Sequence, residues 1–93
     1  MLISKFAKSR EVLMSAPRPV QVAMSNMILY REAEVELRAD IAERFDYPSL
    51  WAAIDRLMYF VEQRAKAEQE VFDANFTYDD SFALCEYTSQ GDV

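Results

Sequence analysis

The sequence predicts an all-α fold built on a long antiparallel helical hairpin, with helices over about residues 20–45 and 48–75, and three observations support this. The 93 residues include only one glycine and three prolines, whereas a β-rich domain of this size would use more glycine in its turns. Apolar residues recur at three- and four-residue steps, which is typical of amphipathic helices. The chain is 52% apolar and short enough for one core, so residues 1–93 form one predicted domain.

The first element is a predicted N-terminal helix over residues 1–16, which ends where Pro17 and Pro19 forbid its continuation. Its basic residues alternate with apolar ones, a composition shared with organelle presequences and with helices that lie on membrane surfaces. The simpler interpretation, which we favour, is an ordinary first helix of the fold. Its apolar positions are Leu2, Ile3, Phe6, Leu13 and Met14.

A long helix is predicted over residues 19–45, because no helix-breaking residue occurs after Pro19 and that proline suits a first helical turn. One face of this helix is apolar and is therefore predicted to be buried. The residues of that face are Ala23, Met27, Tyr30, Ala33, Leu37, Ile41 and Phe45.

A second long helix is predicted over residues 48–75, since Pro48 breaks the pattern and Asp46 or Tyr47 suits the cap. The short connection makes the two helices antiparallel neighbours, and the register then pairs Ile41 with Ile54 and Ala23 with Phe72. The predicted buried stripe of this helix consists of Leu50, Ile54, Leu57, Val61, Ala65 and Phe72.

The last segment, residues 76–93, is predicted to hold a short helix over about 80–88 and a frayed tail. Thr77 and Asp80 have the spacing of a capping box, in which each residue's side chain accepts a hydrogen bond from the other's backbone N–H.

More apolar surface is present than two helices can bury. Residues 57–61 are apolar on every side of their helix. Either the terminal segments fold over this surface and complete a monomeric core, or the hairpin pairs with another copy into a helical bundle or docks on a different protein. The predicted partner-binding residues of this region are Trp51, Met58, Tyr59 and Phe60.

The composition removes most catalytic chemistry. The chain has no histidine, one cysteine and one glycine, which excludes Ser-His-Asp and Cys-His nucleophiles, the common zinc sites and phosphate-cradling loops. We therefore predict no catalytic residue, no metal and no cofactor. The single Cys85 favours a reducing, cytoplasmic location, and no apolar run approaches the ~20 residues that span a membrane.

Charge is distributed unevenly. Residues 1–18 carry four basic groups and one acidic group, a net +3, and the remainder carries six basic and fifteen acidic groups, a net −9. An acidic body argues against direct nucleic-acid binding and favours a partner with a basic surface. Glu36, Asp40 and Glu43 are the predicted acidic contacts. Partial mimicry of nucleic-acid phosphates is an alternative to an ordinary mixed helical surface.

Glu34 and Glu68 fall on or near the predicted buried stripes. A structural ion pair with Arg31 or Arg64 explains a buried carboxylate there better than a carboxylate metal site does, because the Glu-x-x-His motif of such sites is missing.

These observations together predict a non-enzymatic protein–protein interaction module. We expect an accessory protein of phage type that inhibits or modulates a larger protein machine, docking through an apolar helical face and an acidic surface. The alternative is a structural or assembly protein, or a helical-hairpin chaperone, that associates with itself, possible homodimers included.

Overall fold

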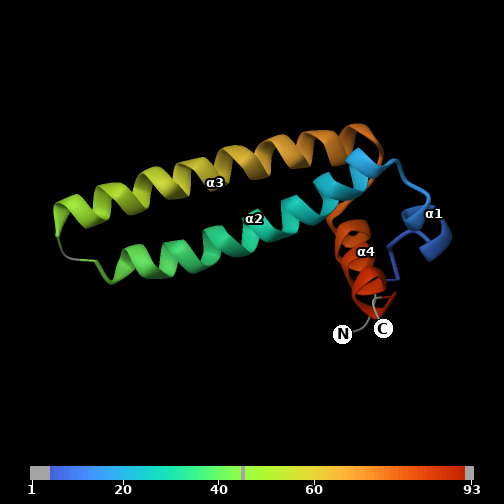
Figure 1. Cartoon of the computed structure of the whole chain (residues 1–93), viewed down its shortest axis with the longest axis horizontal. Coiled ribbons are helices and arrows are strands. Elements are labelled where there is room, and N and C mark those ends of the chain that lie inside the picture. The colour runs from blue at the N-terminus through green and yellow to red at the C-terminus, as the bar shows by residue number, and fades with distance from the viewer. Residues whose placement is uncertain (1–4, 45, 92–93) are drawn as a thin grey trace.

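A computed structural model describes residues 5–44 and 46–91, which form four helices with no strand among them. The helices are α1 (Arg10–Met14), α2 (Arg18–Ala42), α3 (Tyr47–Asp73) and α4 (Tyr78–Gly91). The predicted all-α fold and its long antiparallel hairpin, α2 and α3, are confirmed (Figure 1). Predictions that concern Leu2, Ile3, Phe45 or residues 92–93 lie outside the described residues.

The prediction of an N-terminal helix over residues 1–16 is wrong in extent, because α1 is a helix of five residues, Arg10–Met14. The side chain of Ser9 accepts a hydrogen bond from the backbone N–H of Val12 and so begins the helix at Arg10. The preceding residue, Lys8, donates its backbone N–H to Asp80 of α4 at 2.7 Å. This contact ties the segment before α1 to the other end of the chain.

The hairpin begins and ends close to the predicted positions. Pro19 lies in the first turn of α2, and α2 ends at Ala42, before the predicted residue 45. The side chain of Asp46 caps α3 by accepting the backbone N–H of Ser49 at 3.0 Å. Capping by Asp46 fixes the start of α3 at Tyr47, one residue before Pro48.

The chain leaves α3 through a left-handed turn. Asn75 has a φ of 66°, and the backbone N–H of Phe76 donates to the carbonyl of Val71 at 3.1 Å, closing the end of the helix. The capping box predicted for the next helix is present: Thr77 N–H donates to Asp80 at 2.9 Å and Asp80 N–H donates to Thr77 Oγ1 at 3.2 Å. The resulting α4 is longer than the predicted residues 80–88 and includes part of the predicted frayed tail.

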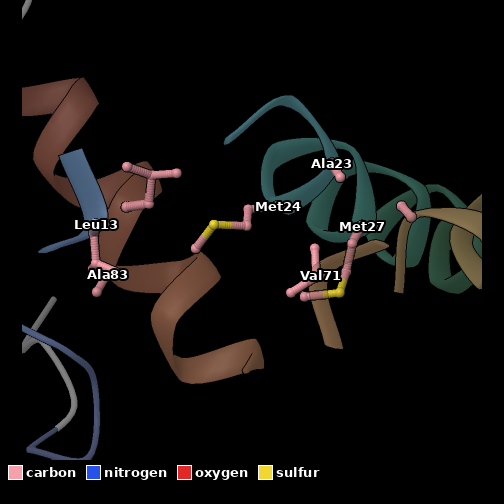
Figure 2. Packing of buried hydrophobic residues seen from close by; sticks show 8 residues of the cluster. Leu13, Ala23, Met24, Met27, Val71 and Ala83 are labelled. Atoms are coloured by element: carbon pink, nitrogen blue, oxygen red, sulfur yellow. The ribbon is translucent and has the colours of Figure 1, made fainter. Parts of the chain in front are cut away.

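The buried core lies at one end of the hairpin, which we call the base. There α4 packs on α2, and α1 packs on α4. Figure 2 shows Met24 reaching from α2 toward α4, while Met27 lies beside Val71 of α3. The cluster consists of Leu13, Ala23, Met24, Met27, Ala67, Val71, Ala83 and Leu84.

The predicted buried stripe of α3 is wrong near the base. Ala65 and Phe72, predicted to be buried, are exposed, and Ala67 and Val71 occupy the core instead. The cause is that α3 has two neighbouring apolar stripes, and an apolar spacing alone does not say which of them faces α2.

Away from the base the hairpin is only two helices thick. This part, which we call the arm, comprises residues 31–42 of α2 and 47–64 of α3, and it projects away from α1 and α4 (Figure 1). Its length makes the molecule elongated, 49 × 27 × 24 Å. Among the described residues of the arm, only Glu34 and Ala53 are fully buried. The arm therefore has no hydrophobic core of its own.

Candidate interaction surface

The apolar residues of α3 form two parallel rows, each with alternating steps of three and four residues. The first row faces α2: the ring of Phe60 lies 6.0 Å from that of Tyr30, and Ala67 and Val71 belong to the core. The second row has the same spacing as the apolar residues through which helices pack against each other in coiled coils. We call it the open row, and it consists of Tyr47, Trp51, Ile54, Met58, Val61 and Ala65; Glu68 separates it from Phe72.

Most of the open row is in contact with solvent. Trp51 is 61% exposed, Met58 66% and Tyr47 75%, whereas Ile54 and Val61 are half-buried. A helix with one buried row needs apolar residues on only that side. The second row on α3 is therefore surplus to the fold of the single chain.

The open row is closed at the base by the start of α4. The ring of Phe72 packs edge-on against that of Tyr78 at 6.0 Å, and the Tyr78 hydroxyl donates to Glu68. Tyr78 therefore marks where the open row ends. From Ala65 to Tyr47 no described side chain of another helix covers the row's exposed members, Trp51 and Met58 among them.

Two carboxylates border the open row on its side away from α2. Asp55 and Glu62 lie four residues after Trp51 and Met58, so they are their neighbours on the helix surface. Both are exposed; Glu62 has a loose ion pair with Lys66 at 3.8 Å, and Asp55 forms no ion pair with any residue of the described segments. The border of the row is therefore acidic.

The four apolar residues predicted to bind a partner do not share one face. Trp51 and Met58 lie together on the open row, and Tyr59 is 52% exposed but rotated by about 100° from Met58. Phe60 is half-buried between the helices, against the rings of Tyr30 and Tyr59. Only Trp51 and Met58 therefore form a continuous exposed surface.

The predicted acidic contacts are exposed: Glu36 and Asp40 lie on α2, and Glu43 is the residue that follows its last turn. Glu36 comes two residues after Glu34, which faces α3, so it is rotated by about 200° and points away from α3. Asp40 is already bonded by Arg44, at 2.6 Å. The structure thus separates these carboxylates from the open row, which is bordered instead by Asp55 and Glu62.

The two helices of the arm are joined by a polar network around Arg64. Its guanidinium donates across the hairpin to Glu34, with Nη2 3.2 Å from Oε1, and along α3 to Glu68 at 2.5 Å. Glu34 is only 4% exposed. Burial favours the neutral form of Glu68, but hydrogen bonds from Tyr78 and Arg64 prevail and hold its pKa below the usual range. The ion pair predicted for Glu34 is thus present.

Two further ionisable side chains, Cys85 and Asp80, have pKa values shifted by their surroundings in the fold. Burial raises the pKa of the Cys85 thiol, which disfavours the reactive thiolate. Burial also disfavours the charged form of Asp80, but hydrogen bonds from the backbone and ammonium of Lys8 outweigh it and lower the pKa of Asp80. Within residues 5–44 and 46–91, no three His, Cys, Asp or Glu side chains are grouped so that they can hold a metal ion.

A smaller apolar surface lies where α2 meets α4. α4 covers Met24 and Ile28 but leaves Val35 exposed, beside a shallow hollow of about 310 Å³ that Phe82 also lines. This hollow is one helix away from the open row and is bordered by both charges, from Arg31 and Glu32.

In the described part of the chain, no helix has the length and apolar character needed to cross a membrane.

Compared with models of known protein families, with curated protein sequences and with solved structures, the chain has no significant match. Its function is therefore inferred from its own surface.

Proposed function

We propose that this protein is a non-enzymatic protein–protein interaction module that docks on a larger protein through the open row of α3. The observation that supports the proposal is the row itself: Trp51 and Met58 are adjacent, exposed and held on a rigid helix. Fully burying one large apolar side chain contributes about 1.5–3 kcal/mol. Two such anchors with half-buried Ile54 and Val61 between them suit the centre of a binding surface.

The arm positions the open row away from the core of the protein. The base holds the two helices together through a buried core, while the arm extends beyond it and meets α4 at its inner end, where Arg31 lies over the ring of Tyr78. The Glu34–Arg64 contact fixes α3 against α2, so that the outer side of α3 keeps its orientation. A binding face that is already helical loses less conformational entropy on binding than a segment that must first fold, which favours affinity. Modulation or inhibition of a larger machine is the role that we assign to such docking.

Affinity capture with matched variants tests the proposal. The tagged protein is incubated with lysate of the organism that encodes it, and retained proteins are quantified for wild type, Met58→Glu and Leu29→Glu. Leu29 is a fair control because it is 60% exposed on α2, similar to Met58, but lies outside the open row. We expect Met58→Glu to lose a partner that Leu29→Glu retains. Equal retention by both variants would refute docking through the open row.

Self-assembly is the second candidate function. Large residues stand at one end of the open row, Tyr47 and Trp51, and smaller ones at the other, Val61 and Ala65. An antiparallel copy would therefore place large residues against small ones. The same arrangement brings the acidic border of one copy against that of the other, and the chain has a net charge of −6. Repulsion between the two borders is why we rank a different protein above a second copy.

A further inference from the structure

We infer that the occupant of the open row is an amphipathic helix with lysine or arginine along one flank. This inference rests on the proposed function and specifies the chemistry of the partner. On a helix, alternating steps of three and four residues over Tyr47, Trp51, Ile54, Met58, Val61 and Ala65 form one stripe that follows the helix axis and drifts around it by about 20° per heptad. The structure that matches such a stripe along its whole length is another helix.

The two sides of the open row differ, and this difference determines the partner's polarity. Toward α2 the row continues into half-buried Leu50 and Leu57 and, seven residues further on, into Arg64, whose charge is paired with Glu34 and Glu68. Away from α2 it is bordered by Asp55 and Glu62, one turn after Trp51 and Met58. A helix in the row therefore meets two leucines and an arginine that is already paired on one flank, and two carboxylates on the other.

Charge complementarity then selects a basic flank. In helix pairs, the residues beside the apolar row pair across the interface and determine which partners associate. Asp55 has no ion pair among the described residues, and Glu62 has only the 3.8 Å contact with exposed Lys66. Both carboxylates are available to a partner, and both would repel an acidic one.

The length of the row sets the size of the partner helix. It extends from Tyr47 near the tip of the arm to Ala65, beyond which Tyr78 contacts the ring of Phe72 and donates a hydrogen bond to Glu68. At about 1.5 Å per residue, a facing helix of roughly 18–20 residues fills it.

Two synthetic peptides of about 21 residues, without aromatic side chains, serve as probes. Both have leucine at every position of a three-four repeat, and they differ only in carrying lysine or glutamate on the flanks. Binding is followed through the fluorescence of Trp51, which is the chain's single tryptophan and lies in the row. We expect the lysine peptide to shift the emission to shorter wavelength and the glutamate peptide to bind at least about tenfold more weakly.

Two double variants of equal charge separate a local contact from general attraction to an acidic protein. Asp55→Lys/Glu62→Lys is expected to weaken the lysine peptide about tenfold and to strengthen the glutamate peptide. Glu36→Lys/Glu43→Lys changes the net charge equally at exposed positions on α2 and at its C-cap, neither of which belongs to α3, so it is expected to change binding less than about twofold at 0.15 M salt. Circular dichroism of each variant verifies that the exposed substitutions leave the helices intact.

The outcomes separate this inference from the proposed function. Equal binding of the two peptides, or equal effects of the two double variants, would overturn the basic flank. Binding of neither peptide would overturn the helical partner, while capture that depends on Met58 would still support the interaction module. A dimer in sedimentation that Met58→Glu dissociates would overturn both the different partner and its chemistry in favour of a second copy.

Discussion

Replacing Glu34 by alanine removes the carboxylate that Arg64 contacts across the hairpin. Glu34 is 4% exposed, and breaking a buried ion pair typically costs 3–5 kcal/mol, ~4 in the middle of the range. Two facts reduce the effect here: the Arg64 side chain is 25% exposed, and it keeps Glu68 at 2.5 Å. We therefore expect the free energy of unfolding to fall by about 2–3 kcal/mol.

A loss of that size is easily measured in a chain this small, because domains of this length have total stabilities of about 5–14 kcal/mol. Urea unfolding followed by circular dichroism gives the midpoint and slope for wild type, Glu34→Ala and Glu36→Ala. Glu36 is the matched control because it is exposed, two residues away on the same helix. It is expected to change the free energy of unfolding by less than about 0.5 kcal/mol.

A double variant tests the cause of the loss. Glu34→Leu/Arg64→Leu replaces both charges by apolar side chains and is expected to recover part of the stability, because no unpaired charge remains at position 34 or 64, while half-buried Glu68 loses Arg64 and keeps the Tyr78 hydroxyl. If Glu34→Ala destabilises no more than Glu36→Ala, or if the double variant is less stable than Glu34→Ala, the network does not hold the arm together as described.

Three further predictions concern the base and the ends of the helices. Asp80→Ala removes the carboxylate that accepts the backbone N–H groups of Thr77 and Lys8, and it is expected to lower the free energy of unfolding by about 2 kcal/mol. In the same urea unfolding measurement, the control Asp79→Ala, at an exposed position, should change it by only about a few tenths of a kcal/mol. The pKa values of Glu68 and Asp80 lie below their ordinary 4.5 and 3.8, so the folded chain binds protons less readily than the unfolded one. The stability that these two groups contribute is therefore complete above about pH 5 and is lost as the pH falls through their folded pKa values. Glu68→Gln/Asp80→Asn should reduce that loss, measured as the dependence of the urea unfolding midpoint on pH. Met24→Ala leaves a cavity at the base and should lower the free energy of unfolding by about 2–5 kcal/mol, measured by thermal or urea unfolding. Met58→Ala, on the open row, should lower it by less than about 0.5 kcal/mol. Similar losses for both variants would contradict the placement of the core.

The hairpin was predictable because its signals are local. Pro19 and Pro48 begin helices, Asp46 caps one of them, and the Thr77–Asp80 spacing predicted the capping box that precedes α4. Each of these depends on a few neighbouring residues, so no knowledge of the tertiary structure was needed.

The core along α3 was less predictable, because the helix has two apolar rows. Ala65 lies in one row and Phe72 beyond its end, whereas Ala67 and Val71 lie in the other, and both rows have helical spacing. The choice depends on contacts far apart in sequence, such as Arg64 with Glu34 and Phe60 with Tyr30. The five-residue length of α1 was missed for a similar reason, since Lys8 is held by Asp80, 72 positions later.

The predicted partner-binding residues remain predictions. Trp51, Met58 and Tyr59 are exposed and Phe60 is half-buried, while the acidic residues chosen from the sequence lie on α2 or at its C-cap, away from the open row. Asp55 and Glu62 were missed although their spacing from Trp51 and Met58, four residues each, was already a sufficient signal.

The separation of a cored base from an uncored arm has a consequence for how long the chain persists in a cell. Segments with few buried contacts open more often than the rest of a protein, and proteases cleave the opened form. Amide hydrogens of residues 34–42 and 50–58 should therefore exchange faster than those near Met24 and Val71. A partner helix on the open row would slow that opening, so that the concentration of the partner sets the turnover of this protein and unbound copies are removed first.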